Sequence, residues 1–412
     1  MLSIHFIREN IDLVKQNCAN RRMLVDIDAL IALHDKTREI SLAIDNLRAE
    51  RNKNSATKPT PEEIMRLKQV GDQIATLEKE FTVANARLHE LWMQVPNMSH
   101  PETPIRGEED FKILAPGTKP HFDFEPKDHE QLMIDLDVID FERGAKVTGS
   151  KFYFTKGDLV KLNAALIRYG IDIAEKYGFT LMETPDLAKN SILQGIGFNP
   201  RGEETQIYSI ENTDLSLIGT AEITMGGYHQ DEILDLTSGP LKYVALSHCY
   251  RTEAGSYGRT SKGLYRVHQF TKLEMFVYCK PEDSEKIHQE LLAIEREICD
   301  GLEIPYQVID IATADLGGPA YRKFDIEAYM TMADGFGEIT STSNCTDYQA
   351  NRLMIRYKDT DGKNKPVHTL NGTAIVTSRF PIAIFENHQQ QDGSIKIPTV
   401  LIPYTGFAFI TK

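Results

Sequence analysis

The chain has few of the residues and segments that mark secreted or zinc-binding proteins. Its five cysteines are Cys18, Cys249, Cys279, Cys299 and Cys345. Because their number is odd and no two of them form a CxxC pair, the sequence predicts neither a disulfide framework nor a zinc site. The opening stretch carries Arg8 and Glu9 where a signal peptide needs an unbroken apolar core. We therefore expect a cytoplasmic protein with free thiols.

Long apolar runs and an excess of positive charge are also missing. The longest uncharged stretch near the end, residues 397–411, contains Pro398, Pro403 and Gly406 and is too short to span a bilayer. Lys and Arg number 46 against 60 for Asp and Glu, which gives a net charge of −14. This balance argues against a generally basic nucleic-acid coat, although it leaves room for a local basic stripe. We expect no membrane association and no DNA partner.

The sequence lacks the glycine-rich loops that hold phosphates in many nucleotide-binding proteins. There is no GxxxxGK followed by Ser or Thr, and the near match to GxGxxG at Gly195 and Gly197 has Pro200 where the third glycine belongs. A nucleotide would therefore have to be held by side chains. Arginine suits this task because its planar guanidinium group bonds two phosphate oxygens at once.

The first hundred residues carry a coiled-coil pattern. Between residues 28 and 96, mostly apolar residues alternate at spacings of three and four, as in helices that wrap around one another. They are Leu30, Leu33, Thr37, Ile40, Ile44 and Leu47 in the first helix, and Leu67, Val70, Ile74, Leu77, Phe81, Ala84, Leu88, Leu91 and Val95 in the second. Thr60 can cap the second helix, with Pro61 at its first position. The short break between the helices predicts an antiparallel two-helix arm.

Such an arm can serve more than one purpose. Heptads alone favour a helical bundle or a dimerisation zipper, because most coiled coils join proteins to proteins. Basic residues off the seam are mixed with acids, so they form a solvated face as readily as one that binds phosphate. A Pro-rich, polar stretch follows Val95, and we place the domain boundary near residue 103. The expected domains are residues 1–103 and 104–412, because 412 residues exceed what one core usually serves.

From about residue 111 the pattern changes to helices interleaved with short strands. The expected helices are residues 160–177, 284–302 (capped by Ser284) and 381–389, and the expected strands are residues 179–183, 243–250, 265–278, 337–342 and 373–378. The connections are too long for a simple meander and too irregular for repeated βαβ units. The sequence therefore predicts an α+β domain in which helices flank an antiparallel sheet.

The first stretch with chemical content runs from Tyr250 to Glu274 and contains a glycine- and hydroxyl-rich loop at residues 254–263. If two strands flank this loop, alternation places Arg251 and Glu253 on one face. By the same rule one face holds Arg266, His268, Phe270, Lys272 and Glu274, while Val267 and Gln269 point the other way. Two arginines, an aromatic ring and two acids can bind phosphates, stack on a base and hold an ammonium group. A salt-bridged sheet face is the alternative.

Two further stretches carry polar residues of interest. In residues 337–350, Glu338 and Ser341 offer hard oxygen ligands of the kind that magnesium accepts alongside substrate phosphates. Hydroxyl-rich strands are also common without any ligand. In residues 369–379, Arg379 enters an apolar helix directly after a strand of small residues. For Arg379 the alternative is a helix residue that pairs with an acid.

Taken together, several motifs resemble those of the seryl-tRNA synthetases, which are class II aminoacyl-tRNA synthetases. They are MLSIHFIREN, FDFEPKDHEQL, TGSKFYF, RTEAGSYG followed by GLYRVHQFTKLE, HTLNGTAIVTSR and IPTVLIPY. The motifs occur in this order over nearly the whole chain. The resemblance implies a class II synthetase-type antiparallel sheet flanked by helices, with an N-terminal coiled-coil arm that binds tRNA.

The resemblance also implies roles for individual residues. Those matched to ATP are Arg251, Glu253, Arg266, Val267, His268, Phe270, Glu338, Ser341 and Arg379, of which Arg251 and Arg379 are also matched as catalytic. Those matched to serine are Thr220, Glu222, Arg251, Glu274, Asn371 and Thr373. Glu338 and Ser341 match magnesium ligands, and Pro185 matches a position at a dimer interface.

The implied activity is that of a serine–tRNA ligase that uses ATP and Mg²⁺. A homodimer would activate serine to seryl-adenylate and transfer the seryl group to the 3′ end of tRNA(Ser), and also of tRNA(Sec). Two other functions stay open, a ligase that loads an amino acid on a carrier protein and a non-catalytic RNA-binding relative. Residues 194–210 differ from the usual family sequence, which could alter the lid over serine.

Overall fold

The computed structural model describes residues 1–53, 60–105, 107, 110–198, 206–253 and 263–412. The chain divides into two compact units, Met1–Met98 and Ser99–Lys412. This division lies near the boundary expected at residue 103. Except for Gly263, the loop expected at residues 254–263 lies outside the described residues. In the described ranges, no helix is both long enough and apolar enough to cross a membrane.

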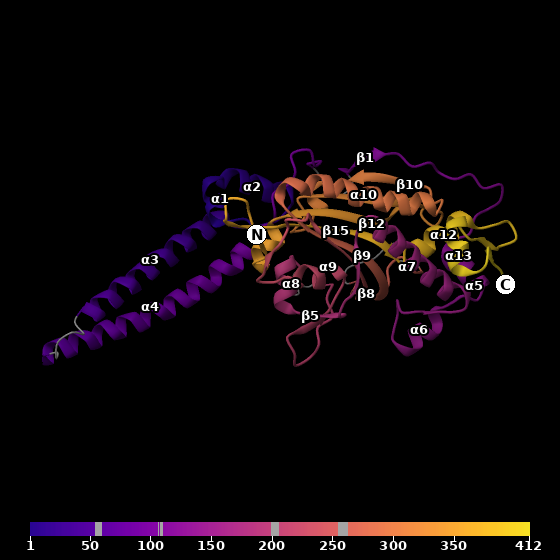
Figure 1. Ribbon diagram of the computed structural model, residues 1–412. Helices are drawn as coiled ribbons and strands as arrows, with labels where there is room; N and C mark the ends of the chain where they lie inside the picture. The colour runs from indigo at the N-terminus through magenta and orange to yellow at the C-terminus, as the bar shows by residue number, and fades with distance from the viewer. Residues whose placement is uncertain (54–59, 106, 108–109, 199–205, 254–262) are drawn as a thin grey trace. The chain divides into compact units, whose positions relative to one another are not determined.

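The first unit is helical. Its helices are α1 (Ile4–Glu9), α2 (Ile11–Asn20), α3 (Ile27–Lys53) and α4 (Pro61–Gln94). Helices α3 and α4 run side by side as the two legs of a hairpin (Figure 1). The seam between them buries Ile40, Ile44, Val70 and Ile74, as the spacing of three and four predicts. The prediction of an antiparallel coiled-coil arm is confirmed.

The start of α4 follows from its local sequence. The Thr60 side chain accepts a hydrogen bond from the Glu63 N–H, and the Glu63 carboxylate accepts one from the Thr60 N–H. This reciprocal pair is a capping box. Pro61 occupies the first helical position, where the helix needs no backbone donor. The predicted Thr60 cap is therefore present.

Ion pairs connect α3 and α4 outside the apolar seam. Lys36 pairs with Glu80, and Arg48 pairs with Glu78, each at 2.8 Å. All four side chains are about half exposed, so each pair contributes little to stability. Part of the basic surface of the arm is thus neutralised within the arm itself, whereas Arg38 is exposed.

Two short helices that the sequence pattern did not predict lie at the base of the arm. Helices α1 and α2 bury Ile7 and Val14 in a cluster that includes Leu88 of α4. The Trp92 indole N–H donates to the Leu2 carbonyl at 2.8 Å, which ties the chain start to the end of α4. The base therefore has a small apolar core, in which α1 and α2 pack against the seam residues Leu30, Leu88 and Leu91.

The second unit is built on an eight-stranded sheet with the order β1-β10-β11-β12-β15-β9-β8-β4. Its strands are β1 (Lys112–Ala115), β4 (Thr180–Glu183), β8 (Leu241–Tyr250), β9 (Gln269–Cys279), β10 (Tyr306–Asp310), β11 (Arg322–Met330), β12 (Gly335–Thr346) and β15 (His368–Val376). Neighbours are antiparallel except β4 and β8, which are parallel. A parallel neighbour requires a long crossover, which the chain between β4 and β8 supplies. The predicted antiparallel sheet is confirmed, with this one parallel edge.

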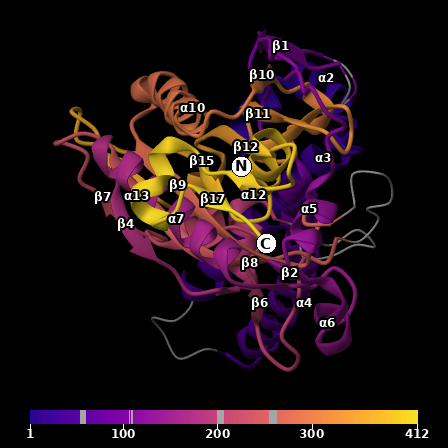
Figure 2. The same cartoon turned by 90° about the vertical axis from the view of Figure 1, so that its right-hand side faces the viewer.

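Helices cover both faces of the sheet. They are α5 (His129–Asp135), α6 (Phe141–Val147), α7 (Asp158–Lys176), α8 (Asn190–Ile196), α9 (Ala221–Gly227), α10 (Ser284–Gly301), α11 (Tyr348–Leu353), α12 (Phe380–His388) and α13 (Ile402–Thr405). Helices α7 and α10 pack against β15, next to β9 and β12 (Figures 1 and 2). Gly170 permits this approach, since a Cβ there would lie 2.6 Å from Ile375 Cγ1.

Successive side chains of β9 point to opposite faces of the sheet, and only one of these faces packs against the main core. Leu273, Met275 and Val277 lie in the main core with residues of α7 and α10. Residues of even number in β9 therefore point to the opposite face. There Phe276 and Tyr278 pack with residues of α9 and α11, in a second apolar cluster. Lys272 and Glu274, on the same face, are left beside this cluster.

Strand β9 begins later than the sequence predicts. The predicted strand starts at Tyr265, whereas β9 starts at Gln269. The preceding residues leave the sheet, because the Leu264 N–H bonds to Nε2 of His129 instead of to a neighbouring strand (3.1 Å). Alternation along a strand consequently does not decide which way residues 265–268 point.

The predicted cap of α10 is wrong. A 3₁₀ turn, Pro281–Asp283, precedes this helix and places Ser284 at its first helical position. The Ser284 hydroxyl donates to the Pro281 carbonyl at 3.1 Å and does not cap the helix. The helix itself is present close to its expected bounds.

Candidate active site

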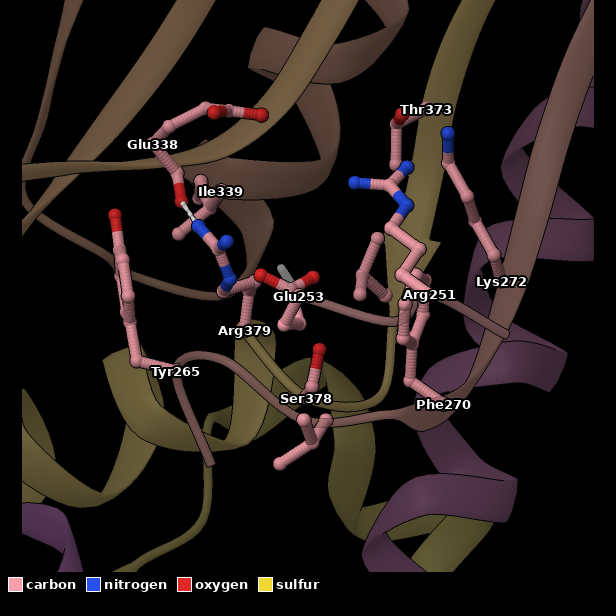
Figure 3. A pocket seen from close by; sticks show the side chains of 12 residues that line it. Arg251, Glu253, Tyr265, Phe270, Lys272, Glu338, Ile339, Thr373, Ser378 and Arg379 are labelled. Carbon is pink, nitrogen blue, oxygen red and sulfur yellow. Dashed lines mark hydrogen bonds between the residues drawn. The ribbon is translucent and has the colours of Figure 1, made fainter. Parts of the chain in front are cut away.

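A pocket that is partly open to solvent lies on the sheet face to which Lys272 and Thr373 point (Figure 3). Its lining residues are Arg251, Glu253, Tyr265, Val267, Phe270, Lys272, Glu338, Ile339, Thr373, Val376, Ser378 and Arg379. They come from β9, β12 and β15, from the chain that follows β8, and from the start of α12. Three chain segments that are distant in sequence thus meet in one pocket.

Arg251 follows the last residue of β8. Its Nε donates to the Gly219 carbonyl at 3.2 Å, and its guanidinium carbon lies 5.3 Å from the centre of the Phe270 ring. The second contact has the geometry of a cation–π interaction. Figure 3 shows the Arg251 guanidinium group directed toward the ends of Lys272 and Thr373. Arg251 therefore extends from the Phe270 ring toward the end of the pocket at which Lys272 and Thr373 lie.

Arg379 lies at the N-terminus of α12, on the other side of the pocket. Its guanidinium carbon is 3.8 Å from the centre of the Tyr265 ring, and its Nη1 donates to the Glu338 carbonyl at 2.6 Å (Figure 3). The ring and the carbonyl oxygen fix its direction. These contacts differ from the alternative in which Arg379 only pairs with an acid, because they are made to a ring and to a backbone carbonyl.

Arg266 occupies a different position from the other two arginines. It is absent from the pocket lining, and its Nη1 lies 3.3 Å from Oε2 of Glu253, which does line the pocket. Glu253 has a φ of +49°, so the chain turns there and does not continue as a strand. Arg251 and Glu253 nevertheless both face the pocket, although strand alternation is not the reason.

Val267 and His268 also differ from the alternation argument. Val267 lines the pocket together with Phe270, although alternation assigns the two to opposite faces. His268 is absent from the lining, and its Nδ1 lies 2.9 Å from the Arg251 carbonyl oxygen. These outcomes arise because residues 265–268 are not part of β9. His268 thus contacts the backbone that carries Arg251.

A compact buried cluster of polar side chains forms one end of the site. Lys272 Nζ lies 2.5 Å from Glu274 Oε2 and donates to Thr220 Oγ1 at 3.3 Å. The Thr373 hydroxyl donates to the same Glu274 oxygen at 3.3 Å, and Thr373 stands directly opposite Glu274 in the sheet. All four side chains are buried. The cluster thus brings hydroxyl, carboxylate and ammonium groups together, and Lys272 and Thr373 also line the pocket.

Glu222 adds a second acid beside Glu274. Thr220 caps α9 by accepting a hydrogen bond from the Glu222 N–H at 3.2 Å, and Gln349 donates to Glu222 Oε1 at 2.8 Å. Burial raises the pKa of Glu222 to about 7, and the negative charge of Glu274 acts in the same direction. Glu222 and Glu274 are not among the lining residues of the pocket, although Lys272 and Thr373, which contact Glu274, are.

Asn371 lies farther from the centre of the pocket. It shares a sheet face with Thr373, two residues away on β15, and its side chain is buried. Its Nδ2 lies 4.0 Å from the Cys345 sulfur, and Asn371 is not among the lining residues. The structure thus brings Thr220, Glu274 and Thr373 together and leaves Asn371 beside them.

Glu338 and Ser341 lie on β12; Glu338 lines the pocket and Ser341 does not. Desolvation works to raise the pKa of Glu338, but the cations around it, Arg379 foremost, hold that pKa below its usual range. Ser341 stands opposite Asp325 of β11 and hydrogen-bonds to its carboxylate. Burial raises the pKa of Asp325 to about 7, Lys323 lowers it, and Glu338 raises it further.

These residues fit a divalent cation that is also held by phosphates. In the described ranges there is no group of three or more His, Cys, Asp or Glu side chains that could hold a metal alone. Magnesium needs fewer, because it is usually held by one or two carboxylates plus substrate phosphates and water. Glu338 supplies an ionised carboxylate and Ser341 a hydroxyl. Asp325 Oδ1 is buried without a hydrogen-bond partner, so an acceptor oxygen is left open beside these residues.

Sequence reasoning assigned no role to five of the lining residues, Tyr265, Lys272, Ile339, Val376 and Ser378. Tyr265 covers Arg379, and Lys272 pairs with Glu274, yet neither was assigned a role. The position of Lys272 could have been recognised from the sequence, because alternation places it on one face with Glu274. The role of Tyr265 could not be recognised in this way, because its contact with Arg379 depends on a turn outside the strand. The segment 199–205, within the unusual residues 194–210, lies outside the described residues.

Comparisons with known proteins agree with this fold. Residues 206–388 match the family described as tRNA synthetase class II core domain (G, H, P, S and T). Residues 1–99 match the family described as Seryl-tRNA synthetase N-terminal domain. The sheet, the pocket and the core match define the chain as a class II aminoacyl-tRNA synthetase.

Full-length relatives specify the family further. The chain is 56% identical to a serine–tRNA ligase of Treponema denticola, with 99% of each chain covered. The crystal structure of seryl-tRNA synthetase from Pyrococcus horikoshii complexed with ATP has a TM-score of 0.90 and 38% identity, covering 100% of this chain and 99% of that one. The serine–tRNA ligase of Naegleria fowleri in complex with AMP has a TM-score of 0.84 and 28% identity, covering 98% and 96%. The chain belongs to the seryl-tRNA synthetase family.

Proposed function

We propose that this chain activates serine with ATP and transfers the seryl group to the 3′ end of tRNA(Ser). Membership of the seryl-tRNA synthetase family supports this activity. The observation that carries the assignment of the site is the joint lining of one pocket by Arg251 and Arg379, with the Lys272–Glu274 cluster at one end. In this site a triphosphate and an amino acid would lie end to end.

Activation joins the serine carboxylate to the α-phosphorus of ATP and releases pyrophosphate. Arg251, directed toward the polar cluster, is suited to bind both the carboxylate and the α-phosphate, which would align them for attack. Arg379 is suited to bind the far phosphates and to neutralise the charge that develops on pyrophosphate. Phe270 and Val267 offer apolar surface for the base. No protein nucleophile is required for this step.

Glu338 and Ser341 would hold Mg²⁺ together with ATP. When bound there, the ion would supply further neutralisation of phosphate charge. The low pKa of Glu338 supports this role, because an ionised carboxylate is the better ligand. Arg266 would act through Glu253, and His268 through the backbone of Arg251, so both would orient groups that bind ATP.

The buried cluster is proposed as the serine site. Glu274 and Glu222 would attract the substrate ammonium, and Thr373 would hydrogen-bond to the hydroxyl group, with Thr220 beside them. Asn371 would contribute from the edge. A site that hydrogen-bonds the substrate hydroxyl would reject alanine by about 10⁴, because alanine leaves buried polar groups unpaired.

The second step transfers the seryl group from the adenylate to a terminal ribose hydroxyl of tRNA. We propose that the arm formed by α3 and α4 binds tRNA, and that tRNA(Sec) is served as well as tRNA(Ser). We also propose a cytoplasmic homodimer, with Pro185 at its interface. The chain would then consist of an arm domain, residues 1–103, and a catalytic domain, residues 104–412.

Amino-acid-dependent exchange of pyrophosphate into ATP tests the first step. The purified protein with Mg²⁺ is expected to exchange with serine, weakly with threonine, and not measurably with alanine or glycine. Removal of Mg²⁺ with a chelator is expected to stop exchange, and added Mg²⁺ to restore it. An absence of serine-dependent exchange in the folded protein would contradict the proposal.

A further inference from the structure

A buried histidine–glutamate pair lies outside the pocket lining and connects two segments that build the pocket. His129 of α5 and Glu386 of α12 are both fully buried, and His129 Nδ1 lies 2.7 Å from Glu386 Oε1. His129 Nε2 accepts a hydrogen bond from the Leu264 N–H at 3.1 Å. Because an accepting ring nitrogen carries no proton, the proton of the neutral ring is on Nδ1 and is donated to Glu386.

Glu386 is itself fixed by several donors. Its Oε1 also accepts from the His129 backbone N–H at 3.0 Å. Its Oε2 accepts from the Thr331 hydroxyl at 2.9 Å and from the Met332 N–H at 3.3 Å. A carboxylate with four donors in a buried site has one orientation. The pair therefore joins α5, α12 and the turn between β11 and β12.

A second contact between α12 and the entry to α5 keeps these helices in register. Gln389 Oε1 accepts from the Lys127 N–H at 2.9 Å, and Gln389 Nε2 donates to the Lys127 carbonyl at 2.9 Å. Both backbone groups of one residue are thus bound by one side chain. Movement of His129 relative to Glu386 would have to break this contact as well.

The approach of His129 to the chain depends on a glycine. Gly263 has a φ of +58°, which favours glycine, and a Cβ at this position would lie 2.2 Å from His129 Nε2. Any larger side chain would displace the ring from the Leu264 N–H. The hydrogen bond of His129 to Leu264 therefore requires glycine at position 263.

The two residues that follow Leu264 contact residues that line the pocket. Tyr265 lies over the guanidinium group of Arg379, and Arg266 binds Glu253. Arg379 directly precedes α12, the helix that carries Glu386. Both members of the Tyr265–Arg379 contact are consequently attached to the same buried pair, one through Leu264 and the other through α12.

We propose that His129 is a positioning residue for ATP: its imidazole holds residues 264–266 against α12, so that Tyr265 keeps Arg379 directed into the pocket. This inference rests on the proposed function, in which Arg379 binds the triphosphate. His129 is not a catalytic acid or base, because its side chain is fully buried and does not line the pocket. Its effect reaches ATP only through Tyr265 and Arg379.

The test compares two variants with a matched control. In His129→Gln and Glu386→Gln, hydrogen exchange in peptides covering residues 263–270 is expected to become faster. Since a lost buried hydrogen bond of this kind is worth about tenfold in binding, the KM for ATP is expected to rise roughly tenfold, while the KM for serine changes less than about twofold. His388→Gln is the control, because His388 also lies in α12 but bonds to the Leu302 carbonyl (2.9 Å).

The outcomes separate this inference from the proposed function. Unchanged exchange at residues 263–270 and an unchanged KM for ATP in folded His129→Gln would overturn it, as would an equal effect in His388→Gln. If His129→Gln does not fold, Gly263→Ala disturbs the same contact from the other side and must give the same pattern. A parent protein without serine-dependent pyrophosphate exchange would refute the proposed function alone, since hydrogen exchange tests the contact without any substrate.

Discussion

Arg251 is oriented by neutral groups, the carbonyl of Gly219 and the ring of Phe270. Because neither neighbour carries a negative charge, the charge of its guanidinium group is available to a carboxylate or a phosphate. Arg266, by contrast, forms an ion pair with Glu253. Arg251 can therefore bind an anionic ligand without breaking an ion pair, whereas Arg266 would first have to leave Glu253.

Arg251→Ala tests this difference. The substitution is expected to lower serine-dependent pyrophosphate exchange by at least about 100-fold, because a preorganised group that neutralises the reacting charge is lost. The thermal midpoint is expected to stay near that of the parent, since Arg251 is only partly buried. Arg143→Ala, at an exposed arginine paired with Asp140, is the control. Exchange within a few-fold of the parent would remove Arg251 from the mechanism.

Glu222 makes the stability of the protein depend on pH. Its pKa is about 7 in the folded chain because of burial and, next, because of Glu274, whereas a glutamate in an unfolded chain titrates near 4.3. Between these pH values the folded state binds more protons than the unfolded state. The contribution of Glu222 to stability therefore falls as pH rises through this window, and levels off above pH 7 or so.

Glu222→Gln removes this titration and keeps an oxygen for Gln349 to bind. The free energy of unfolding of the variant, relative to the parent, is expected to increase by about 1–3 kcal/mol between pH 4.5 and pH 8. Denaturant unfolding at several pH values measures the difference. Glu211→Gln, at an exposed glutamate, should show no such trend. A flat or opposite trend for Glu222→Gln would show that Glu222 is ionised throughout.

At the scale of elements, prediction from sequence succeeded where the pattern is local. The seam of α3 and α4 repeats along one chain segment, and the Thr60 cap depends on residues three positions apart. Strands β8 and β12 are also marked by their own residues. The parallel β4–β8 edge and the turn at residues 263–268 were not predictable, because both depend on distant partners such as His129.

The same distinction applies to the site. Resemblance to a family identified Arg251, Glu274, Thr373 and Arg379, which the structure gathers around one pocket and its polar end. Alternation alone assigned Val267 to the wrong face, since the strand it assumed begins four residues later. Periodicity predicts a face only where the backbone is extended.

The capping box of α4 gives a prediction for one element. Thr60→Ala is expected to destabilise the first turn of α4 by about 1 kcal/mol, since the side chain no longer accepts from the Glu63 N–H. Hydrogen exchange at the amides of residues 62–66 should become faster. Thr82→Ala, at an exposed site within the same helix, should leave these amides unchanged. Equal exchange in the two variants would show that the cap does not stabilise the helix start.

At the scale of the whole molecule, the chain consists of two units with separate cores. The Lys272–Glu274 cluster and the arginine pocket lie wholly in the second unit. The seam of the arm and its base lie in the first. A change confined to the arm should therefore leave the chemistry of serine activation intact.

A shortened arm separates the two steps of the reaction. Removing residues 37–79 and joining Lys36 to Glu80 by a short Gly–Ser linker uses a pair that already meets across the hairpin at 2.8 Å. The base cluster around Leu88 is kept. Serine-dependent pyrophosphate exchange is expected to stay near the parent level, whereas charging of tRNA(Ser) should fall at least about tenfold, because backbone contacts to the RNA are lost. Unchanged charging would remove the arm from tRNA binding.

The central claim is that one pocket receives both ATP and serine between Arg251 and Arg379. A crystal structure of the protein with a stable seryl-adenylate analogue and Mg²⁺ tests it most directly. We expect the base beside Phe270 and the phosphate group within hydrogen-bonding distance of Arg251. We also expect the seryl ammonium at Glu274 in place of Lys272. An analogue bound elsewhere, or arginines directed into different cavities, would contradict it.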